Sequence, residues 1–159
     1  MTGPEAAAQV RSALEAAVPA WYGRAARVSA LSGPQAPPWS FQFGLAVQTP
    51  AGGRRLVVKI PRWEEAATLE AALAAGPQEG TRREHATLEA LAAAVVRGGD
   101  LGLAAVAPVA YLPEINAVVT ERLEAAPLRA VLGRWPGSEG RRAETLRRAG
   151  RALRLYHDR

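Results

Sequence analysis

The only lysine of the chain, Lys59, lies in the apolar run RRLVVKIPR at residues 54–62. The other 19 of the 20 basic residues are arginine, so the chain uses arginine wherever positive charge alone is needed. Lysine offers a compact ammonium with three rotatable donors, which suits contacts with phosphate oxygens and a carboxylate. Strand alternation places Val57 and Lys59 on one face and the larger aliphatic residues on the other. Lys59 is therefore a candidate anion-binding residue; the alternative is an edge-strand lysine that reaches solvent.

Glu84 is the strongest candidate partner for Lys59. It lies at helical spacing with Leu88 and Leu91, so it continues the apolar stripe of a predicted helix. A carboxylate on a buried helix face needs a partner. The same residue also ends the motif TRRE, which fits a capping box that begins at Thr81. The two roles compete for one carboxylate, and the inward ion pair with Lys59 is favoured.

Glu70 and Glu89 are rival partners for Lys59, and both lie among polar neighbours. His85 and His157 are isolated from each other in the sequence, so they predict no metal site.

The elements that must position Lys59 and Glu84 alternate between strand and helix patterns. We expect a helix over 4–18, strands over 27–31, 39–49 and 55–60, helices over 64–76 and 81–97, and strands over 103–112 and 115–120. SGPQAPP (32–38) is expected to be a turn-rich break, and TPAGG (49–53) a hairpin turn. ERLEAAP (121–127) is a connector, followed by a short helix, a loop and a final helix over 139–157. The fold class is α+β, with a five-stranded antiparallel sheet and packed helices.

The order strand, hairpin, VVKI, a helix with REHATLEALAAA, two strands and VVTERLEAAPL resembles the N-terminal lobe of the protein-kinase-like fold. Among its branches it is most similar to the aminoglycoside phosphotransferase/choline kinase type, over about residues 27–157. The resemblance implies an N-terminal helix at 1–26, the lobe at 27–120, a hinge at 121–127 and the first helices of an incomplete C-lobe at 128–159.

By this resemblance Lys59 orients the α- and β-phosphates of ATP, and Glu84 holds the lysine. Thr120 takes the gatekeeper place at the back of the adenine pocket. The backbones of Glu121 and Leu123 face the adenine edge, and Val57 packs on the ring. The implied cofactors are ATP and Mg²⁺, whose ligands would come from the missing C-lobe.

The chain departs from the family pattern at the phosphate-covering loop. SGPQAPPWS offers only Gly33, with three prolines, so few backbone N–H groups can cradle phosphates. Gly44 is placed inside the second strand and outside this loop.

The family's catalytic Asp and Asn, in an H-x-D-x-x-x-x-N loop, are expected beyond Arg159. The end of the chain, YHDR, has the wrong spacing, so His157 and Asp158 are read as a helix terminus.

The net charge of +5 belongs to residues 134–159, where eight arginines stand against three acidic residues. Nucleic-acid binding by this basic helix is the weakest hypothesis, because no recognisable motif accompanies it. The chain has no cysteine and no long apolar run, so a cytoplasmic protein that does not enter a membrane is expected.

Two main functions are compatible with these features. The first is the ATP-binding lobe of a small-molecule phosphotransferase, which would use a hydroxyl substrate through the missing C-lobe. This chain alone would be inactive, and would need a second chain or show self-association. The alternative is a non-catalytic kinase-like regulatory or scaffold module, with the basic C-terminal helix as its interface.

Overall fold

The computed structural model describes residues 3–97, 104–124, 140 and 143–150. Contacts divide the chain into two compact units: a sheet unit (Met1–Glu89 with Val106–Arg122) and a second unit (Ala90–Ala105 with Leu123–Arg159). All the candidate site residues except Leu123 belong to the sheet unit. The boundary between Arg122 and Leu123 falls inside the segment 121–127 that is predicted to be a hinge.

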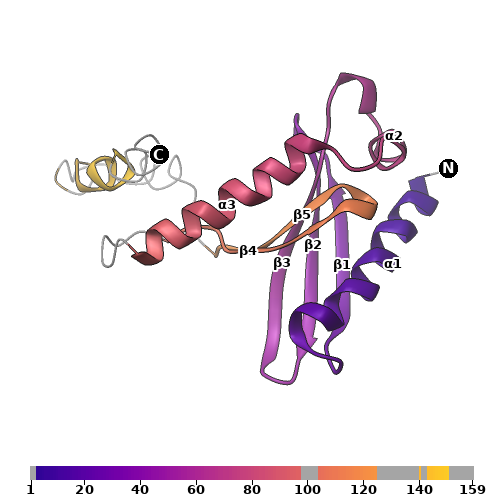
Figure 1. Ribbon diagram of the computed structural model, residues 1–159, viewed down its shortest axis with the longest axis horizontal. Helices are drawn as coiled ribbons and strands as arrows, with labels where there is room; N and C mark the ends of the chain where they lie inside the picture. Colours follow the sequence, from indigo (N-terminus) through magenta and orange to yellow (C-terminus); the bar gives the residue numbers. More distant parts are fainter. Residues whose placement is uncertain (1–2, 98–103, 125–139, 141–142, 151–159) are drawn as a thin grey trace. The chain divides into compact units, whose positions relative to one another are not determined.

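A five-stranded antiparallel sheet with the order β1-β2-β3-β5-β4 organises the sheet unit (Figure 1). Its strands are β1 (Arg27–Gln35), β2 (Ser40–Thr49), β3 (Gly52–Pro61), β4 (Pro108–Leu112) and β5 (Ala117–Glu121). The helices are α1 (Gly3–Tyr22), α2 (Leu69–Ala74) and α3 (Glu79–Arg97), with 3₁₀ turns η1 (Glu64–Ala66) and η2 (Pro113–Ile115). The predicted α+β class and the five-stranded antiparallel sheet are confirmed. None of the described helices is long and apolar enough to cross a membrane.

The two faces of the sheet differ in what covers them. On one face, Phe43 of β2 and Val58 of β3 are almost fully buried and share a core with α1. Helix α1 lies along the sheet on the side of β1 (Figure 1), and buries Val10 and Leu14 at helical spacing. The opposite face carries Val57 and Lys59, which are only half-buried. The strand alternation therefore separates a core face from an accessible face, as the sequence predicts.

Strand β1 is longer than predicted, because it runs through Gln35 and so includes the first four residues of the expected break at 32–38. Gly33 makes this possible: its φ is +109°, and a Cβ there would lie 2.8 Å from the carbonyl oxygen of Gln42. The register of β1 against β2 shifts around this glycine. Glycine and proline therefore mark a strand irregularity here, and the turn itself shrinks to residues 36–39.

The helices that follow β3 also differ from the prediction. The helix expected at 64–76 is split into η1 and α2, and Thr68 caps α2 by accepting from the backbone N–H of Ala71 at 3.3 Å. Helix α3 begins at Glu79, two residues before the predicted cap at Thr81. The hydroxyl of Thr81 is buried without a hydrogen-bond partner, so the predicted capping box does not form.

Candidate functional site

Lys59 on β3 and Glu84 on α3 form the centre of the candidate site. Their Nζ and Oε1 atoms are 2.7 Å apart, a distance typical of a charge-assisted hydrogen bond. The two side chains retain 36% and 34% of their surface exposed, so the pair lies at the margin of the core. Solvent weakens the attraction of such a pair, but it also leaves the ammonium accessible to an anionic ligand. The predicted inward ion pair is present.

The rival carboxylates lie elsewhere. Glu89 faces His85 on the same helix, with 3.6 Å between Oε2 and Nδ1. Glu70 is directed toward the start of α1, where its Oε1 is 3.5 Å from the position that a Cβ would take on Gly3. Because the Thr81 cap is not formed, Glu84 has no competing role at the helix start, and it is the partner of Lys59.

Strand pairing places Lys59 in the middle of the accessible face. Its partner in the register on β2 is Gln42, and its partner on β5 is Val118. Val118 is 1% exposed and Gln42 is half-buried, so Lys59 has an apolar neighbour on one side and a polar one on the other. Its ammonium extends beyond both toward α3.

Val57 forms a second row on the same face, two residues along β3 from Lys59. It pairs with Gly44 on β2 and with Thr120 on β5, and all three are half-buried. Gly44 has no side chain, and a Cβ there would lie 2.8 Å from the Ser32 hydroxyl. The Ser32 side chain therefore occupies the space that a Cβ on Gly44 would need, and Val57 and Thr120 supply the side chains of this row.

The segment predicted to be a hinge begins at the end of β5. The backbone N–H of Glu121 donates to the carbonyl of Ala107 at 2.9 Å, so this N–H group is already used within the sheet unit. Its carboxylate lies 3.8 Å from Arg54, on the side of Tyr22 rather than that of Lys59. Burial raises the pKa of Tyr22, and the charge of Glu121 raises it further. Leu123 is 48% exposed and belongs to the second unit.

Asn116 is a residue that the sequence analysis misses. It is fully buried in the turn before β5, and its Oδ1 accepts the backbone N–H of Gln78 at 3.0 Å. The hydroxyl of Tyr111 reaches the same oxygen at 3.4 Å. Asn in a turn that follows Pro113 is a sequence signal for left-handed backbone, but nothing local indicates a partner 38 residues away.

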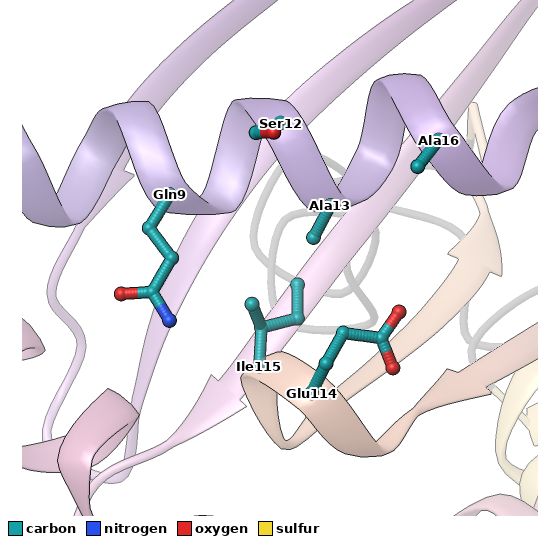
Figure 2. Close-up of a pocket in the computed structure, with 6 residues that line it drawn as sticks. All are labelled: Gln9, Ser12, Ala13, Ala16, Glu114 and Ile115. Atoms are coloured by element: carbon teal, nitrogen blue, oxygen red, sulfur yellow. The ribbon is translucent and has the colours of Figure 1, made fainter.

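A groove of about 370 Å³ lies between α1 and η2, at a different place from Lys59 (Figure 2). It is lined by Gln9, Ser12, Ala13, Ala16, Glu114 and Ile115. Figure 2 shows Gln9 reaching down from the helix and Glu114 standing at the rim opposite. None of the six residues predicted to bind nucleotide lines this groove.

The basic helix predicted at 139–157 is described at residue 140 and over 143–150, where it is helical. Within this part Glu144 pairs with Arg147 and with Arg148. His157 and Asp158 lie outside the described residues, as do residues 125–127 of the hinge. In the described part of the chain, no three His, Asp or Glu side chains gather as a metal-ligand set.

Comparison of the chain with models of protein families, with curated proteins and with solved structures found no match to any of them.

Proposed function

We propose that the sheet unit binds ATP on its accessible face, as the nucleotide-binding lobe of a small-molecule phosphotransferase. The observation that carries the proposal is the 2.7 Å contact between Lys59 and Glu84, on the same sheet face as Val57 and Thr120. A strand lysine held by a helix glutamate is the arrangement that orients ATP phosphates in kinase-like proteins. The resemblance in the order of motifs supports the same function.

The contacts of Lys59 suit a phosphate ligand. An ammonium has three N–H donors, and the single contact with Glu84 uses one of them. The carboxylate of Glu84 holds the ammonium in position. The other two N–H groups of Lys59 therefore keep a fixed direction. Because the pair is one-third exposed, a phosphate can approach without the cost of opening a core.

The base of the nucleotide would lie on the row formed by Val57, Gly44 and Thr120. Val57 would pack on the ring, beside the half-buried Thr120 of the neighbouring strand. The carbonyl of Glu121 would face the adenine edge. Mg²⁺ would neutralise phosphate charge when bound, and its ligands are to be sought outside the described residues.

Transfer of a phosphoryl group to a hydroxyl also needs a base that accepts the hydroxyl proton. The 159 residues contain no H-x-D-x-x-x-x-N motif, so we assign nucleotide binding to this chain and the transfer step to a further lobe.

Titration of the chain with ATP, followed by calorimetry, tests this proposal. Lys59→Ala removes a charged donor to phosphate, a contact that contributes about 1.5–3 kcal/mol. We therefore expect the affinity to fall by about 10- to 150-fold. Glu84→Gln should weaken binding in the same direction, since the lysine loses its restraint.

Glu89→Gln is the matched control, because it makes the same chemical change on the same helix without touching Lys59. Its affinity for ATP should equal that of the unaltered chain. Equal affinities in the Lys59→Ala and Glu89→Gln variants, with both folded by circular dichroism, would rule out the proposed site.

One observation favours the second candidate, a kinase-like module that regulates or scaffolds a partner without catalysis. Gly33 is the only glycine of the predicted phosphate-covering loop. The close approach of β1 to the backbone of Gln42 already requires a glycine at this position. Few backbone N–H groups are then directed at a triphosphate. A folded chain that does not bind ATP at all would support this second function.

A further inference from the structure

The start of helix α3 is capped from outside the helix. Gln78 directly precedes α3, and its carbonyl accepts the N–H groups of Thr81 at 3.1 Å and Arg82 at 3.2 Å. Its own backbone N–H donates to Asn116 Oδ1 on the turn between β4 and β5. In a capping box, a side chain three residues into the helix accepts this N–H. Here Asn116, 38 residues away in the sequence, accepts this N–H instead.

Asn116 is well suited to this role. Its φ of +48° is a left-handed conformation that asparagine adopts more readily than most residues. It is fully buried, and Tyr111 donates to the same oxygen, whereas its Nδ2 group has no hydrogen-bond partner among the described residues. A buried amide so placed specifies one position for whatever it binds.

The same strand locates both members of the ion pair. Asn116 directly precedes β5, and Val118, two residues later, pairs with Lys59 in the sheet. Gln78, held by Asn116, is six residues before Glu84. In a helix this separation corresponds to about 9 Å, and a shift of one residue rotates a side chain by about 100°. Glu84 can therefore meet Lys59 only when α3 begins at the correct place relative to β5.

We propose that Asn116 is a positioning residue for the Lys59–Glu84 pair, acting through the backbone N–H of Gln78. The claim about the ion pair stands on the contacts alone. Its consequence for ATP affinity rests on the proposed function.

Because the chain has one lysine, protein labelled only with ¹⁵N-lysine gives a single side-chain Nζ signal in NMR. The signal of a Glu84→Gln variant marks the unpaired state. Asn116→Gly removes the amide but tolerates the positive φ. Asn116→Asp keeps an acceptor oxygen and also tolerates the backbone. Glu114→Gln alters an exposed residue of the same turn and is the control.

We expect Asn116→Gly to change the Nζ chemical shift of Lys59. The change should be more than half of the change that Glu84→Gln produces. Asn116→Asp and Glu114→Gln should leave it near the original position. A simple loss of stability would not produce this pattern in folded protein. If Asn116→Gly leaves the signal in place, or Asn116→Asp moves it equally far, the proposal is wrong.

A measurement on the unaltered chain keeps the proposal testable even if a variant does not fold. The amide hydrogen of Gln78 should be protected from exchange to a degree similar to the amides of the first turns of α3. Exchange of Gln78 at the rate of an open chain would overturn the proposal. ATP titration of Asn116→Gly is a separate readout: a moved Lys59 signal without any ATP binding by the unaltered chain contradicts only the nucleotide function.

Discussion

At the scale of single residues, the contact between Lys59 and Glu84 is better suited to binding than to stability. Both side chains are about one-third exposed, so water competes with their attraction. A fully buried pair would behave differently, since removing one partner leaves an uncompensated charge in the core. In the proposed function, this exposed pair would hold the ammonium in position for an anionic ligand.

The first prediction concerns the stability that this pair contributes. Glu84→Gln should lower the free energy of unfolding by less than about 1 kcal/mol, as expected of an exposed ion pair. Urea unfolding followed by circular dichroism measures this. A loss of about 3 kcal/mol or more would show that the pair behaves as a buried one.

The second prediction concerns Tyr111, which contacts Asn116. Burial raises the pKa of Tyr111 above its ordinary value of 10.0. The folded chain then keeps the phenol proton at a pH where the unfolded chain has lost it. The stabilisation is complete below pH 10 and is lost as pH rises through the raised pKa.

Unfolding free energy measured from pH 9 upward should therefore fall more steeply in the unaltered chain than in Tyr111→Phe. Absorbance of the phenolate follows the titration directly. Parallel stability curves for the two proteins would contradict this account of Tyr111.

At the scale of elements, the end of β1 contains glycine and proline, residues that usually indicate a turn, within a continuous strand. Gly33 and the prolines around it predict a break, and β1 nevertheless continues to Gln35. The reason is the close approach of the two backbones, which only glycine permits at this φ. The sequence indicates correctly that the backbone is unusual here, but not that the strand persists.

The third prediction compares two glycines of the sheet. Gly33→Ala places a Cβ at positive φ and 2.8 Å from a carbonyl oxygen, so it should destabilise the chain by at least about 1–3 kcal/mol. Gly53→Ala meets no atom within 4 Å. It should be neutral or stabilising by up to about 1 kcal/mol. Thermal and urea unfolding of the two variants should separate them clearly, and similar stabilities would refute the close approach.

At the scale of the whole molecule, three of the four exposed large apolar side chains among the described residues belong to the second unit. Val96 is 81% exposed, Leu146 is 54% and Leu123 is 48%. In the proposed phosphotransferase, side chains of this kind would pack on a further lobe. In the isolated chain they are available for self-association.

The fourth prediction is that the chain associates in a concentration-dependent manner, as sedimentation equilibrium would show. Burying one such side chain contributes about 1.5–3 kcal/mol, so Val96→Glu or Leu146→Glu should weaken association by about 10-fold or more. Glu114→Gln, at an exposed polar site in the sheet unit, is the control and should have no effect. A chain that stays monomeric throughout would contradict this expectation.

The sequence alone determines the properties that repeat along the backbone. Strand alternation places Val57 and Lys59 on one face, and helical spacing places Glu84 on the stripe that faces inward. The α+β class follows from the same two periods. These predictions succeed because the covalent geometry of a strand or helix determines which residues share a face.

The tertiary structure alone decides which of the competing local roles each residue takes. Glu84 fits a capping box as well as an ion pair, and its partner lies 25 residues away. The choice depends on Asn116, which starts α3 at Glu79 by binding Gln78 across 38 residues. No local pattern encodes such a contact, because it exists only once the turn before β5 and the start of α3 have packed together.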